Sequence, residues 1–156
     1  MSTVAVRSDV PAWGDGLLDV MVEGPEGRRL SDADLRRLFP GSALTGVRLN
    51  RLTNWPRLVV RLNDVPVALA TYTQHDGETQ IPDFALDVPA PANADSSLRR
   101  RALDALIDAV QLAALAGACR RVVLIPPSDA VSMLERRGFT TINEGCAGAW
   151  MEKSLT

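Results

Sequence analysis

The sequence is poor in the residue types that build metal and redox sites. It contains one histidine and two cysteines in 156 residues. Zinc sites need closely spaced cysteine and histidine ligands, and no such cluster is present, so no metal is expected. Cys119 and Cys146 each lie among small or apolar residues, which is typical of an inert free thiol rather than a nucleophile, and no disulfide is suggested.

Long apolar runs and a dominant charge are also missing. No run approaches the ~20 residues that cross a bilayer, and Met1–Asp15 lacks the basic and apolar regions of a signal peptide. The 17 basic and 19 acidic residues are interspersed, with a net charge of −2, so no broad basic face for nucleic acid is expected. A cytoplasmic protein that binds neither membrane nor nucleic acid is predicted.

The composition is otherwise that of one globular domain. The chain is 46% hydrophobic and 23% charged, and its length suits a single α/β domain. Residues 1–16 are predicted to be a flexible lead-in, and residues 17–156 the domain. Lys153 is the only lysine among the basic residues; a GC-rich bacterial genome explains this bias, and a preference for the bidentate geometry of arginine is the alternative.

The first half of the domain predicts strands followed by hairpins. Leu17–Val22 reads as a strand, and Ser31 caps a helix that ends at Pro40-Gly41. The segment between Gly41 and Pro56 fits either a short helix or an irregular loop. Three antiparallel strands follow, joined by the turn dipeptides Asn63-Asp64 and Asp76-Gly77, at Arg57–Leu62, Val65–Gln74 and Gln80–Val88.

The second half alternates helix and strand. Apolar residues at helical spacing predict a long helix over Ser97–Ala116, and Arg121–Ile125 reads as a strand buried on both faces. A last helix, capped by Ser128 or Asp129, is predicted to run to Arg137 before Gly138. A closing hairpin follows, with strands at Phe139–Asn143 and Gly148–Ser154.

This order of elements resembles the GNAT superfamily of N-acyltransferases. The matching segments are the end of the fourth strand, the long helix, the fifth strand, the end of the last helix and the C-terminal strand: Leu86–Val88, Leu98–Leu106, Val122–Leu124, Leu134–Phe139 and Met151–Leu155. The resemblance implies a single GNAT-like α/β (α+β mixed) domain. Its sheet would be mixed and mostly antiparallel, with a V-shaped splay between the fourth and fifth strands and about four flanking helices.

The same resemblance implies acetyl-CoA, or another acyl-CoA, as co-substrate. Backbone groups of Leu86 and Val88 would hold the pantetheine arm, and amides of a loop and helix start would hold the pyrophosphate: Asn93, Ala94, Ser96, Ser97, Leu98 and Arg99. The family motif is Arg/Gln-x-x-Gly-x-Gly/Ala, whereas this chain has Ala94, Ser97 and Arg99 at its three defining positions. Asp95 adds a carboxylate beside them. A pyrophosphate site and a plain capped helix start both fit these residues.

Catalytic residues are fewer than the family pattern would supply. Asp83 lies where many members carry a general base, and Leu134 stands where many carry a tyrosine acid. Strand alternation puts Asp83 on one face with Ala85 and Asp87. That face is expected to be solvated, and a base in a cleft is the alternative. Tyr72 could serve as a general acid, although a tyrosine at such a position is more typical of packing. His75 is expected at an exposed loop tip, and Trp55 is expected to line a groove. Trp150 is expected in core or sheet-face packing.

Two functions follow from these observations. The first is transfer of an acetyl or acyl group to an amine, on a small molecule or a peptide, by a monomer or homodimer. The second is a catalytically silent GNAT-like domain that binds a ligand or a protein partner, because the glycines and the tyrosine of the family pattern are missing. Beside these two functions, an interaction module that pairs through its C-terminal strands, with Gly145–Lys153 as a sheet edge, is a third interpretation.

Overall fold

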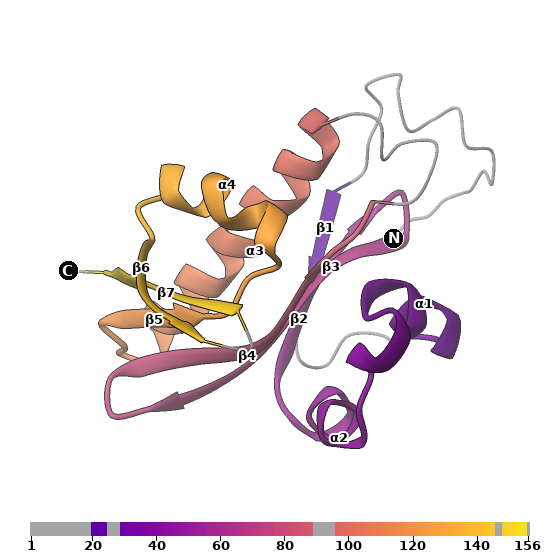
Figure 1. The fold of residues 1–156 in the computed structure, drawn as a ribbon, viewed down its shortest axis with the longest axis horizontal. Helices are drawn as coiled ribbons and strands as arrows, with labels where there is room; N and C mark the ends of the chain where they lie inside the picture. The colour runs from indigo at the N-terminus through magenta and orange to yellow at the C-terminus, as the bar shows by residue number, and fades with distance from the viewer. Residues whose placement is uncertain (1–19, 25–28, 89–95, 146–147, 156) are drawn as a thin grey trace.

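The computed structural model describes residues 20–24, 29–88, 96–145 and 148–155. Within them a seven-stranded sheet has helices on both faces (Figure 1). The strands are β1 (Val20–Glu23), β2 (Arg57–Leu62), β3 (Val65–His75), β4 (Glu78–Leu86), β5 (Arg121–Leu124), β6 (Thr140–Gly145) and β7 (Gly148–Ser154). The helices are α1 (Asp32–Leu38), α2 (Gly46–Asn54), α3 (Ser96–Ala116) and α4 (Val131–Arg136), with short 3₁₀ turns at η2 (Gly41–Ala43) and η4 (Ser128–Ala130).

The sheet is antiparallel except at its centre. Its strand order is β1-β2-β3-β4-β5-β7-β6, and only the β4–β5 pair is parallel. A parallel pair needs a crossover connection, which the long helix α3 provides. The predicted mixed and mostly antiparallel sheet is therefore confirmed.

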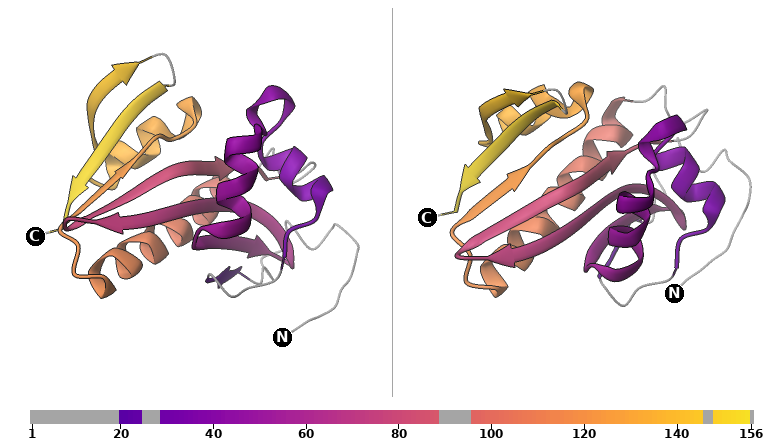
Figure 2. Two further views of the ribbon diagram at one scale, coloured as in Figure 1. Left: turned by 90° about the horizontal axis from the view of Figure 1, so that it is seen from below. Right: turned by 60° about the horizontal axis from the view of Figure 1, so that its bottom comes forward.

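The two central strands separate after four paired residues. β4 pairs with β5 from Glu78 to Ile81 and then continues to Leu86, whereas β5 ends at Leu124. Pro82 comes directly after the last paired residue and has no N–H to donate to a ladder. Figure 2 shows β5 and β7 turning away from β4 beyond this point. This divergence is the predicted V-shaped splay. The name splay is used below for the segment 82–86, which pairs with β3 at residues 83–86 but not with β5, and for its surroundings.

The hairpin turns have the backbone conformation that their sequence predicts. Asn63 and Asp64 have φ values of 49° and 72°, and Asp76 and Gly77 have values of 53° and 77°. Two consecutive residues with positive φ match the right-handed twist of the strands they join. These turns fix the register of β2, β3 and β4, and through it the face on which each β4 side chain lies.

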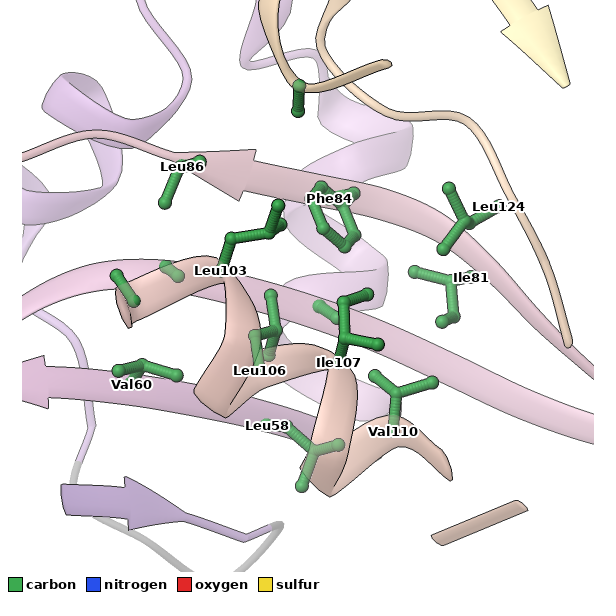
Figure 3. Packing of buried hydrophobic residues seen from close by; sticks show 14 of the residues in the cluster. Leu58, Val60, Ile81, Phe84, Leu86, Leu103, Leu106, Ile107, Val110 and Leu124 are labelled. Carbon is green, nitrogen blue, oxygen red and sulfur yellow. The ribbon is translucent and has the colours of Figure 1, made fainter. Parts of the chain in front are cut away.

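One face of the sheet packs against α3 and α4. Buried leucine, isoleucine, valine and phenylalanine side chains of α3, β2, β4 and β5 interdigitate there, as Figure 3 shows for Leu103, Leu106 and Ile107 of α3 and for Phe84 and Leu86 of β4. Leu134 and Phe139 complete the cluster from the far end of the chain. This cluster holds α3 across the sheet and so fixes its N-terminal end next to the splay.

The opposite face packs against α1 and α2. A smaller cluster there joins Leu38 and Phe39 to Leu52 of α2 and to sheet residues that include Ala85. Ser31 caps α1 as predicted, because its hydroxyl accepts a hydrogen bond from the Asp34 amide at 3.1 Å. The segment after Pro40 resolves to a 3₁₀ turn and the helix α2, so the helical alternative for that segment is confirmed.

The start of the last helix differs from its prediction. Ser128 and Asp129 belong to η4, and neither side chain caps η4 or α4. Pro127 fixes the extended backbone that leads into η4, so the helix begins without a side-chain cap. Gly138 has a φ of +93° and ends α4 as predicted. The predicted lead-in, Trp13, Asn93, Ala94, Asp95 and Cys146 lie outside the described residues.

Candidate functional site

Asp83 lies on β4, two residues past the last position paired with β5. Its side chain is fully buried. Four hydrogen bonds reach its two oxygens: Arg48 Nε at 2.8 Å and Arg51 Nη2 at 2.7 Å to Oδ1, and Arg51 Nε at 2.7 Å and Thr71 Oγ1 at 2.6 Å to Oδ2. The expectation of a solvated face is therefore wrong at Asp83, because α2 covers this part of the sheet.

The sequence of α2 explains how two arginines reach one carboxylate. Arg48 and Arg51 are three residues apart, which puts both side chains on one face of the helix. Arg51 donates through Nε and Nη2, the bidentate geometry that a guanidinium forms with a carboxylate. Sequence reasoning identified Asp83 but missed both arginines, since the segment that carries them had no clear periodicity.

The environment of Asp83 lowers its pKa. Burial by itself raises the pKa of a carboxyl group, but the hydrogen bonds from Arg51, Thr71 and Arg48 outweigh burial here and hold the pKa of Asp83 below its ordinary value. A carboxylate with a low pKa and occupied oxygens accepts protons poorly at neutral pH. The geometry therefore suits an anchor that ties α2 to β4, and general-base catalysis by Asp83 stays a prediction.

Arg99 lies at the end of the splay, between Leu86 of β4 and Asp129 of η4. From the first turn of α3 its guanidinium donates to the backbone oxygen of Leu86 at 3.4 Å and to Asp129 Oδ2 of η4 at 2.6 Å. The residue thus links the end of β4 to the start of the last helical segment. Sequence reasoning proposed Arg99 and Leu86 for this site but missed Asp129, which it considered only as a helix cap.

The other residues proposed to bind the cofactor would contact it through backbone groups and not through side chains. The side chains of Val88 and Leu98 are buried in the core beneath α3. Ser96 is the first residue of α3, and Ser97 is exposed in its first turn. The first four N–H groups of a helix have no partner within the helix, so this end of α3 can bind an anion.

The remaining candidates are buried or partly buried apolar and aromatic side chains and one exposed histidine. Leu134 is fully buried in the same cluster as Leu86 and Leu124, the residues that end the two diverging strands. Tyr72 packs against that cluster, and His75 is an exposed loop-tip residue beside Asp76, as predicted. Trp55 is half-buried, and its ring centroid lies 6.0 Å from the Arg51 guanidinium carbon.

The described residues contain no metal-binding cluster and no helix suited to a membrane. No group of three histidine, cysteine, aspartate or glutamate side chains there is arranged to hold a metal ion. No helix in that part of the chain is long and apolar enough to cross a membrane.

Comparisons of sequence and of structure gave different results. No family profile matches the sequence, and no curated protein matches it either. The structure resembles Ard1 from Thermoplasma volcanium, with 16% identity, 88% of this chain and 98% of that chain covered, and a TM-score of 0.59. It also resembles PaiA N-acetyltransferase from Thermoplasma acidophilum, which was solved in complex with coenzyme A. That match has 12% identity, covers 87% of this chain and 99% of that chain, and has a TM-score of 0.58.

A third similar structure is the IAA acetyltransferase from Bacillus cereus, with 9% identity, 88% of this chain and all of that chain covered, and a TM-score of 0.61. These matches extend over nearly the whole of each solved chain at low identity. The chain therefore has the fold of the GNAT N-acetyltransferases, as its sequence predicted. A structural match at such low sequence identity establishes the fold alone, so the activity has to be argued from the site.

Proposed function

We propose that this protein binds an acyl-CoA in the splay and transfers the acyl group to an amine. The observation that carries the proposal is the separation of β4 from β5 after Ile81, which leaves the backbone of residues 82–86 unpaired with β5 next to the N-terminal end of α3. Two solved structures of the same fold contain coenzyme A. Acyl-CoA supplies the activated thioester when it is bound. The residues of this chain bind the acyl-CoA and the amine and orient them toward each other.

The donor groups at the splay fit an anionic co-substrate. Backbone groups of Leu86 and Val88 would hold the pantetheine arm. Amides of Ser96, Ser97 and Arg99 would face the pyrophosphate, because the N–H groups in the first turn of a helix point away from the helix and give this end a partial positive charge. Asn93 and Ala94, which the sequence also indicates for the pyrophosphate, lie outside the described residues. The Arg99 guanidinium lies at the same place, where it pairs with Asp129.

A second candidate function is ligand or partner binding without catalysis. Leu134 has no proton to give to a departing thiolate, and the Asp83 carboxylate is enclosed by arginines. Arg99 moreover already donates to the Leu86 oxygen, a backbone group that the first function assigns to the pantetheine arm. Under this reading the protein would bind a ligand or protein and turn over no acyl-CoA.

One pair of measurements tests both functions. Calorimetric titration with acetyl-CoA is expected to show saturable binding, and incubation with a panel of primary amines is expected to release thiol from acetyl-CoA. Binding without amine-dependent thiol release would favour the silent domain. A complete lack of binding at millimolar acetyl-CoA would reject the acyltransferase.

Removing Asp129 is expected to strengthen acetyl-CoA binding. The Asp129 carboxylate neutralises Arg99 at the end of the splay, so Asp129→Ala frees that guanidinium for a phosphate group. An exposed ion pair contributes up to about 1 kcal/mol, which corresponds to roughly fivefold in affinity. Calorimetry with acetyl-CoA measures the change.

Asp108→Ala is the matched control for this prediction. Asp108 is as exposed as Asp129, at 64% of the side chain, and it also pairs with an arginine, Arg137. Asp108 lies on α3, nine residues after Arg99, which is about 13 Å along the helix axis. An equal gain in affinity for both variants would attribute the effect to net charge and not to Arg99.

A further inference from the structure

Two arginines on α2 carry more hydrogen-bond donors than the structure uses. Each guanidinium has five N–H groups. Arg48 donates one to Asp83 and one to the backbone oxygen of Ala43, and Arg51 donates two to Asp83. Within the described residues, three N–H groups of each arginine have no protein acceptor. Both side chains are partly open to solvent, at 25% and 22% exposure.

The charges at this site do not cancel. One buried carboxylate faces two guanidinium groups, so the cluster carries a net charge of +1. Partial burial weakens the screening of that charge by water. A small anion that reached the free N–H groups would therefore be attracted by both arginines.

The arginines are also held in place before any ligand arrives. Asp83 fixes the Nε group of both. Aromatic rings lie beside each guanidinium, with the Phe39 centroid 4.7 Å from Arg48 and the Trp55 centroid 6.0 Å from Arg51. A guanidinium over a ring still has N–H groups at its edge, and such an edge matches a carboxylate with two parallel hydrogen bonds.

We propose that Arg48 and Arg51 form a carboxylate-binding subsite, and that the amine accepted by this protein carries a carboxylate group. The inference rests on the proposed acyl transfer for its link to an acceptor. Asp83, which anchors the pair, lies in the splay, in the part of β4 that has no partner on β5. On this basis the subsite binds the acceptor from the α2 side of the sheet, and α3 binds the acyl-CoA from the other.

The test uses two probes that differ only in charge. N-acetylglycine carries a carboxylate, and N-acetylglycinamide replaces it with a neutral amide. Titration of the full chain is expected to show at least tenfold tighter binding of N-acetylglycine. The NMR signals of the Arg48 and Arg51 Nε–H groups are expected to shift with the carboxylate and to stay in place with the amide. Equal binding of the two probes would overturn the proposal.

Variants then assign the effect to the pair. Arg51→Gln is expected to weaken N-acetylglycine binding about tenfold, because hydrogen bonds to a charged group are lost. Arg36→Gln removes an exposed arginine of α1 and is expected to leave binding unchanged. An equal loss in the two variants would reject the subsite. If Arg51→Gln does not fold, the comparison of the two probes on the unsubstituted protein still decides the question.

A third probe distinguishes a carboxylate from other oxyanions. Inorganic phosphate that bound as tightly as N-acetylglycine would contradict a site shaped for carboxylates. Neither organic probe contains CoA, so the result is independent of acyl-CoA binding. If the full chain binds acetyl-CoA but shows no preference for N-acetylglycine, this inference alone is overturned. If it does not bind acetyl-CoA, the proposed function is overturned.

Discussion

Replacing Asp83 with alanine is expected to lower the free energy of unfolding by about 3 kcal/mol. The change removes a fully buried carboxylate and leaves the Thr71 hydroxyl and two guanidinium groups without their acceptor. An unsatisfied buried donor alone costs roughly 1–3 kcal/mol. The two arginines are partly exposed and can turn toward water, which keeps the loss below the upper end of the range for buried ion pairs. Urea denaturation measures the difference.

Asp87→Ala is the control, at the first residue after the end of β4. Its carboxylate pairs with Arg37 at 2.9 Å, but 41% of its side chain is exposed. Exposed ion pairs contribute about 0–1 kcal/mol, so this variant is expected to lose much less stability. Similar losses for Asp83→Ala and Asp87→Ala would show that burial of the Asp83 cluster does not determine its contribution.

The Asp83 cluster should also make stability depend on pH. The pKa of Asp83 is lower in the folded protein than its ordinary value, because the hydrogen bonds outweigh burial. A carboxyl group of this kind stabilises the folded state above the unfolded pKa of about 3.9, and the contribution is lost as the pH falls through the lower folded pKa. The stability difference between the unsubstituted protein and Asp83→Asn should therefore shrink below about pH 4. A difference that stayed constant down to pH 2 would contradict the lowered pKa.

The fold was predictable because several local signals agree. The turn dipeptides fixed three consecutive strands, and the periodicity of Ser97–Ala116 fixed the long helix that connects a parallel pair. Each signal acts over a few residues and does not depend on distant packing. The start of the last helix was mispredicted because Pro127 replaces a side-chain cap there with a 3₁₀ turn.

The site was predictable only in part, since it depends on contacts between distant residues. Asp83 was recognised from its place on β4, but its burial is caused by Arg48 and Arg51, more than thirty residues earlier in the chain. Nothing in the local pattern of α2 marked these arginines. Likewise Arg99 and Asp129, thirty residues apart in the chain, meet only through the tertiary structure. Single-sequence patterns report local structure and carry little information on such pairings.

Replacing Leu134 with tyrosine is expected to raise the rate of acyl transfer by about 100-fold, the lower end of the range for an added general acid. Leucine cannot protonate a departing thiolate, and resemblance to the GNAT superfamily places a tyrosine at this position. Leu134 packs in the same cluster as Leu86 and Leu124, where the two strands diverge. The larger ring also overfills a buried position, at a cost of about 1–3 kcal/mol in stability. Thiol release from acetyl-CoA with the best amine of the panel measures the rate.

Leu134→Phe separates the acid from the ring that carries it. Phenylalanine brings almost the same volume and the same overpacking but no hydroxyl, so it should lower stability equally and leave the rate unchanged. The tyrosine variant should in addition lose its advantage above pH 10, where the phenol is deprotonated. Equal rates for the two variants would mean that protonation of the thiolate does not limit transfer here. Acyl transfer by this fold would then depend on orientation of the amine and the thioester, which the arginines of α2 and the first turn of α3 would provide.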